Sequence, residues 1–127
     1  MKFKNFGIFM LCVAMLVSTS ASVRAWAESV IDYEEEYVYY VDGVEVAGAI
    51  FKTSFTYSEP DYVYADSPVA EDEWGIDGFY AGALDLYEGG QPNQFAYAGA
   101  RMATYLGDIC VDYVDIEVHC DVYGNLY

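Results

Sequence analysis

The alternation of residues 114–122 is the feature that most restricts what this chain can fold into. Apolar side chains occupy every even position of this stretch, and polar or charged side chains occupy every odd position. A period of two places these two sets on opposite faces of an extended strand, whereas a helix would mix them. The stretch therefore predicts a β-strand with one buried face and one solvent face. We expect it to be central in its sheet.

A hairpin is predicted further upstream. Asp42 and Gly43 separate the two β-branched and aromatic runs at residues 37–41 and 44–46. An Asp-Gly pair between such runs favours a tight hairpin turn, because both central positions of that turn need positive φ angles.

The strand after this turn should contain an irregularity. Its apolar positions change parity between Ile50 and Phe51. A side-chain period of two can change sides only where an extra residue is inserted. We therefore expect a β-bulge or a bend near residues 48–52.

Residues 94–106 are compatible with two kinds of structure. Their alanines, Met102 and Leu106 suit a helix, whereas aromatic residues at alternating positions suit a strand. The β-elements expected on both sides favour the strand, which Gly107 and Asp108 would then join to the C-terminal strand in a hairpin.

Two segments look irregular: residues 28–36, an acidic N-terminal arm, and residues 66–78, a loop rich in acids with proline and glycine. About six short strands separated by turns remain. They predict an all-β fold, a small antiparallel β-sandwich. The alternatives are a small β-barrel, or an α+β fold if residues 94–106 are helical.

Residues 1–27 predict a secretory signal peptide. A positively charged start is followed by an apolar run of 11 residues, 7–17, and by small residues that end at Ala27. The run is shorter than the roughly 20 residues that span a bilayer. We expect cleavage after Ala27 and a single secreted domain over residues 28–127. It should be extracellular or at the cell surface, without membrane association.

This predicted domain is strongly acidic. It contains all 21 acidic residues and two basic ones, Lys52 and Arg101, which gives a formal charge of −19. Such a charge repels phosphate backbones and anionic lipid surfaces, so we expect no nucleic-acid partner. Cations, basic proteins and neutral polymers remain as partners. The simpler interpretation is that the charge keeps a secreted protein soluble.

A disulfide between Cys110 and Cys120 is possible in a secreted protein. However, ten residues of extended strand span roughly 33 Å, while the Cα atoms of bonded cysteines lie within about 7 Å. The bond would need a chain reversal at residues 112–115, which contain no Gly, Pro or Asn. A bulge there would explain a change of apolar parity equally well. Two buried, unbonded cysteines are therefore favoured.

Glu71, Asp72, Glu73 and Asp77 are the candidate metal ligands. Clustered carboxylate oxygens are what Ca²⁺ prefers, so a calcium site in this segment is a hypothesis. A solvated acidic loop is the simpler interpretation, and no other cofactor is expected.

Catalysis is not indicated. His119 is the only histidine and lies on the polar parity of its strand, opposite in direction to Cys120. The sequence has no G-x-S-x-G motif. We expect no catalytic residues and no enzymatic activity. A small secreted hydrolase using paired carboxylates is the least supported alternative.

Tyrosine is the remaining signal. Nine tyrosines lie in or near the expected strands and are too many for the core alone: Tyr37, Tyr39, Tyr40, Tyr62, Tyr64, Tyr80, Tyr87, Tyr97 and Tyr105. Aromatic residues on a rigid sheet face anchor ligands at low entropic cost. Packing between strands is the alternative use. The sequence therefore predicts a non-catalytic binding module for an extracellular protein or glycan. The alternative is a self-assembling surface-layer component.

Overall fold

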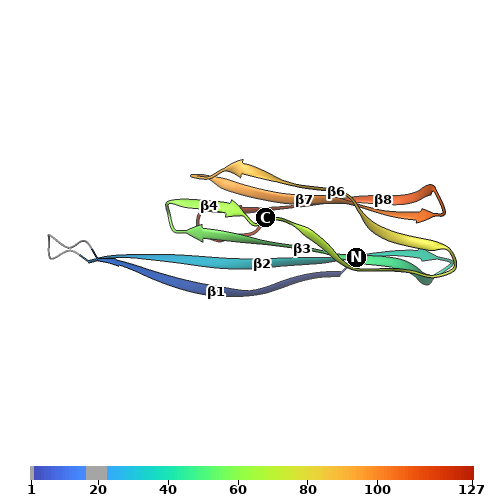
Figure 1. Ribbon diagram of the computed structural model, residues 1–127, viewed down its shortest axis with the longest axis horizontal. Coiled ribbons are helices and arrows are strands. Elements are labelled where there is room, and N and C mark those ends of the chain that lie inside the picture. Colours follow the sequence, from blue (N-terminus) through green and yellow to red (C-terminus); the bar gives the residue numbers. More distant parts are fainter. Residues whose placement is uncertain (1, 17–22) are drawn as a thin grey trace.

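Two antiparallel β-sheets packed face to face make up the computed structural model, which describes residues 2–16 and 23–127 (Figure 1). Sheet A contains β1 (Lys2–Leu16), β2 (Val23–Val41), β3 (Val44–Ser58), β4 (Tyr62–Ala65) and β5 (Val69–Gly75). Sheet B contains β6 (Phe79–Gln91), β7 (Phe95–Leu106) and β8 (Ile109–Asp121). The sheets do not close into a barrel, so the predicted all-β sandwich is confirmed.

The turn chemistry predicted from the sequence is confirmed at two hairpins. Asp42 and Gly43 join β2 to β3 with φ angles of 50° and 79°, as a tight Asp-Gly turn requires. Gly107, with φ 61°, opens the turn between β7 and β8. Residues 95–106 are therefore strand rather than helix.

The bulge of β3 lies before the expected window, whereas β8 contains one that accounts for its change of parity. In β3 the extra residue is Val46, and the strand then pairs with β2 in continuous register through residues 48–52. The β3–β5 shift between Gly48 and Ile50 places its extra residue in β5, because these two residues pair with Trp74 and Glu71. In β8, Cys110 and Asp112 pair with consecutive residues of β7, which leaves Val111 as the extra residue. The chain therefore continues through residues 112–115 as strand, and the parity change comes from a bulge rather than a reversal.

The core is built from unequal halves. Sheet A contributes the large buried side chains, among them Phe51 and Phe55, which are fully buried. Sheet B faces them mostly with small ones: Ala81, Ala96, Ala98 and Ala100. The alanines of β7 thus let the two layers approach each other closely around the aromatic rings of sheet A.

The two segments expected to be irregular form strand, residues 28–36 wholly and residues 66–78 in part. Residues 28–36 belong to β2, where Ser29, Ile31 and Tyr33 are buried at alternate positions and Val30 and Asp32 between them are less buried. Within residues 66–78, β5 pairs with β3. Backbone pairing does not depend on side-chain polarity, so an acidic composition did not prevent either strand.

The prediction that β8 lies at the centre of its sheet is wrong. That position belongs to β7, and β8 forms an edge. The C-terminal residues fold back along this edge: the backbone N–H of His119 donates to the carbonyl of Tyr127 at 2.9 Å, and Cys120 forms a bridge with Leu126. The tail therefore satisfies backbone groups that an edge strand would otherwise leave open.

The predicted signal peptide overlaps the outermost strand. β1 pairs with β2 and lies farthest from sheet B in Figure 1. Residues 17–22 of the predicted leader lie outside the described residues, and the expected cleavage position, Ala27, falls within β2. Cleavage stays a prediction. Among the described residues, no helix is long and apolar enough to cross a membrane.

Candidate aromatic binding face

The outer face of sheet B carries a continuous set of rings, which we call the aromatic platform: Tyr87, Phe95, Tyr97, His119 and Tyr127. Each ring of the platform contacts at least one other, with centroids 5.2 to 6.4 Å apart. Tyr97 is at the centre, in contact with Tyr87, Phe95 and His119. The rings come from β6, β7, β8 and the C-terminal tail, so the folded sheet assembles them from distant parts of the chain.

The alternation of small and aromatic side chains along β7 places the rings on the outer face. Ala96, Ala98 and Ala100 take the parity that faces sheet A and are buried. Phe95 and Tyr97 therefore project from the opposite face and are only partly covered. Strand pairing places His119 directly opposite Tyr97, within reach of a cross-strand ring contact.

Two glycines allow the tyrosine rings to lie across the backbone. A β-carbon at Gly99 would collide with the ring of Tyr87, and one at Gly89 would collide with the ring of Tyr97. Each ring thus covers a neighbouring strand at a position without a side chain. The platform is flatter than a surface of upright side chains would be.

Glu117 fixes two members of the platform. Its carboxylate accepts a hydrogen bond from the Tyr87 hydroxyl at 3.0 Å and lies 2.8 Å from Nε2 of His119. These two hydrogen bonds, that of His119 first, hold the pKa of Glu117 below its ordinary value. Burial, together with this carboxylate, raises the pKa of Tyr87 to about 12. The Tyr87 hydroxyl therefore stays protonated and the contact persists at neutral pH.

An ion pair extends the same face along the sheet. Arg101 binds Asp115 through two hydrogen bonds of 2.7 and 3.0 Å, which lower the pKa of that carboxyl. The guanidinium also lies 4.6 Å from the ring centre of Tyr113. A depression of about 500 Å³ opens here, lined by Leu84, Asp85, Tyr87, Arg101 and Asp115. Because Tyr87 belongs to both, the depression and the platform form one surface.

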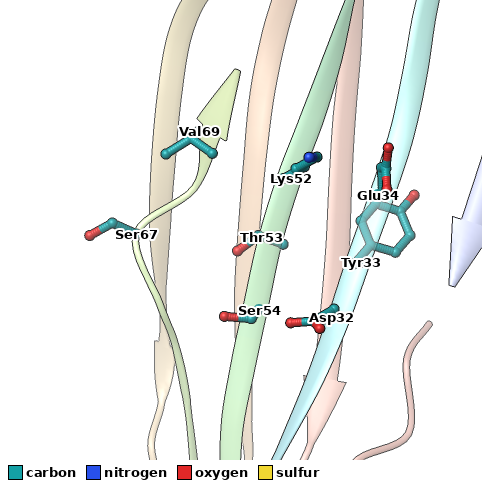
Figure 2. Close-up of a pocket in the computed structure, with 8 residues that line it drawn as sticks. All are labelled: Asp32, Tyr33, Glu34, Lys52, Thr53, Ser54, Ser67 and Val69. Atoms are coloured by element: carbon teal, nitrogen blue, oxygen red, sulfur yellow. The ribbon is translucent and has the colours of Figure 1, made fainter. Parts of the chain in front are cut away.

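A second candidate lies on the outer face of sheet A. Figure 2 shows a pocket of about 310 Å³, lined by Asp32, Tyr33, Glu34, Lys52, Thr53, Ser54, Ser67 and Val69. Its lysine already donates to Glu71 at 2.8 Å. The one ring at this pocket, that of Tyr33, is buried. This pocket therefore offers polar groups but no apolar anchor for a ligand.

The four carboxylates proposed as calcium ligands do not form a cluster. Glu71 pairs with Lys52, while Glu73 accepts a hydrogen bond from the Tyr80 hydroxyl at 2.8 Å. Asp72 and Asp77 have positive φ angles of 52° and 54°, in a bulged strand and in the following turn. Within the described parts of the chain, no group of three or more His, Cys, Asp or Glu side chains could hold a metal ion. The clustering that the calcium hypothesis requires is therefore missing there.

Both cysteines of β8 are free, without a disulfide. Cys120 is fully buried, and its burial raises the pKa of the thiol to about 12. Cys110 is exposed, which corrects the expectation that both would be buried. The bulge at Val111 reverses the parity at this end of the strand and turns Cys110 outward.

The predicted tyrosines divide between several environments. Tyr37 is buried, whereas Tyr40, Tyr64 and Tyr80 are exposed and are not members of the platform. Tyr64 lines a hollow that the platform residue Phe95 also lines. Only two of the nine, Tyr87 and Tyr97, belong to the platform, and its other three members were not predicted to bind a ligand. The outward parity of His119 was the signal available for one of them.

Comparison with protein-family models, curated proteins and solved structures found no match.

Proposed function

We propose that this protein is a non-catalytic, extracellular binding module that holds its ligand on the aromatic platform. The observation that carries the proposal is the contact of five rings on one outer sheet face. Rings held on a rigid sheet offer a large apolar area and lose little conformational entropy on binding. The extracellular location rests on the predicted leader.

Binding suits this face better than catalysis does. Glu117, beside the platform, and His119, a member of it, are hydrogen-bonded to each other on an open sheet face. A general acid or base acts at a bound substrate that a cleft positions. A flat surface instead presents area to an extended or broad ligand.

A printed array of neutral glycans, anionic glycans and extracellular proteins, incubated with the labelled secreted chain, tests this proposal. We expect at least one class of feature to bind the protein and to lose the signal with Tyr97→Ala and with Tyr127→Ala. Tyr127 is 66% exposed, so its replacement leaves the core untouched. Tyr40→Ala is the matched control, since its ring is exposed next to the turn between β2 and β3. Equal signals for platform and control variants would refute the proposal.

Self-assembly is a second candidate, favoured by the position of β2. Residues 28–36 of β2 pair with β1 on one side and with β3 on the other. Removal of the predicted leader would open that first side over nine residues, and open edges pair with other chains. Sedimentation of the chain that begins at Glu28 tests this candidate. Concentration-dependent polymers would support it, and a monomer at all concentrations would reject it.

A further inference from the structure

We infer that the ligand of the aromatic platform is an uncharged polysaccharide, bound along the outer face of sheet B. This inference rests on the proposed function and adds the chemical class of the ligand. It follows from the charge of the face, its shape and the polar groups beside the rings.

Charge is the first consideration. Three carboxylates stand on this face next to the rings, and each already has a hydrogen-bond partner; a further one, Asp85, lines the depression. Glu117 is bound by Tyr87 and His119, and Asp115 by Arg101. Asp121 accepts from the backbone N–H of Tyr123 and from Asn125.

These partners leave little free charge on the carboxylates beside the rings for a cationic ligand to neutralise, and Asp85 interacts electrostatically with Arg101. The 21 acidic residues against five basic ones still repel an anionic polymer at longer range. An uncharged ligand needs no free carboxylate for binding and is not repelled by the negative charge of the protein.

Shape is the second consideration. From Phe95 to Arg101 the face follows β7 over six residue steps, about 20 Å at 3.3 Å per residue. Along this length the rings of the platform are followed by the depression at Arg101, which shares Tyr87 with them. A surface this long and flat fits several consecutive units of a chain rather than one small molecule.

The polar groups are the third consideration. A sugar ring has a face of C–H groups, which packs on an aromatic ring, and an edge of hydroxyls, which needs donors and acceptors. The Arg101–Asp115 pair is partly exposed, at 44% and 57% of its side-chain surfaces, and so can reach such hydroxyls. Asp85 lines the same depression and adds an acceptor.

The experiment is native gel electrophoresis of the secreted protein in gels that contain one polysaccharide each. The neutral probes are hydroxyethylcellulose, mixed-linkage β-glucan, xylan and galactomannan, and the anionic probes are alginate and hyaluronate. We expect at least one neutral polysaccharide to retard the protein and neither anionic one to do so. Affinity for oligosaccharides of the retarding polymer should rise with their length.

Variants assign the binding to the face. Tyr97→Ala should weaken binding roughly tenfold, the effect of losing one ring contact, while Tyr97→Phe should retain it. Arg101→Ala should weaken the binding of long oligosaccharides more than that of short ones, because Arg101 lines the depression beyond the rings. Tyr127→Ala supplies a platform variant at an exposed position, and Tyr40→Ala should behave as the parent chain.

The outcomes separate the inference from the proposed function. Absence of retardation by every neutral polysaccharide would overturn the inference, as would retardation that Tyr97→Ala and Tyr127→Ala leave unchanged. Array signals that appear only on proteins or on anionic glycans, and that are lost with the platform variants, would overturn the inference of a neutral polysaccharide. They would still support the proposed function of the platform in binding. Array signals unaffected by those variants would overturn both.

Discussion

The two sheets distribute their side chains in opposite ways. Sheet A turns its rings inward, where Phe51, Phe55 and Tyr57 are buried, and presents charged side chains on its outer face. Sheet B turns alanines inward and presents rings outward, around Tyr97 and Tyr87. Both sheets have the same alternation, and only the assignment of large and small residues to the two parities differs.

This difference separates folding from surface chemistry. Large buried rings are explained by the stability they provide, because burial of apolar area drives folding. Rings on the outer face of sheet B contribute less to stability, since solvent still reaches them, so their presence needs another explanation. Ligand binding provides one.

The largest expected effect lies in the core of sheet A. Phe51→Ala removes a ring with no solvent exposure and should reduce the free energy of unfolding by about 3–5 kcal/mol. Tyr97→Ala, the matched change on the outer face of sheet B, should reduce it by less than about 1 kcal/mol. Urea denaturation followed by tryptophan fluorescence measures both. Similar losses would show that the outer rings also stabilise the fold.

The inner face of sheet B should be sensitive to added volume. Ala98→Leu places a larger side chain at a fully buried position opposite the rings of sheet A, and overpacking should cost about 1–3 kcal/mol. Tyr97→Leu changes the adjacent outward residue and serves as the control. Thermal unfolding followed by circular dichroism compares them. A tolerated Ala98→Leu would mean that the two layers are less closely packed than described.

A buried hydrogen bond between the sheets should have a smaller effect. The Tyr37 hydroxyl lies 2.8 Å from Oγ1 of Thr104 and donates to Asp112 at 2.8 Å. Tyr37→Phe leaves these polar groups without that partner and should cost about 1–2 kcal/mol. Tyr40→Phe is the control, because its hydroxyl binds Glu45 at an exposed position. Equal denaturation midpoints for the two variants would contradict the expectation.

The smallest expected effect concerns pH. The folded state holds the pKa of Glu117 below its ordinary value, so the carboxylate stabilises the fold above about pH 4.3. This contribution is lost as the pH falls through the lower folded-state pKa. Glu117→Gln should therefore lower stability at neutral pH and make it less dependent on pH between about 5 and 3. Melting temperatures across that range measure it, and parallel curves for both proteins would count against the effect.

Alternation and turn chemistry made most of the fold predictable. Asp42 and Gly43 identified their hairpin, and the parity change in β8 is explained by the bulge at Val111. The bulge expected near residues 48–52 of β3 lies at Val46 instead. The acidic residues 28–36 misled the prediction because composition was given more weight than the buried alternation of Ile31 and Tyr33. The position of β8 at an edge depends on strand pairing, which no single strand encodes.

The platform could be predicted only in part. The outward parity of His119 was visible in the sequence, but its contact with Tyr97 depends on the register of β7 and β8. The glycines beneath the rings depend on register in the same way, since Gly99 lies opposite Tyr87 and Gly89 opposite Tyr97. Abundant tyrosine indicated the kind of surface, while the register of strand pairing between β6, β7 and β8 decided its location.

β7 has a consequence for how such a protein can change over evolution. Its even positions, from Ala96 to Ala100, determine the fit to sheet A, while Phe95, Tyr97 and Arg101 supply the outer face. Mutations at one set therefore have little effect on the other, although both lie in the same strand. A lineage could acquire a new ligand through odd positions while its core stays constant, and a randomised library at those positions would explore the same freedom.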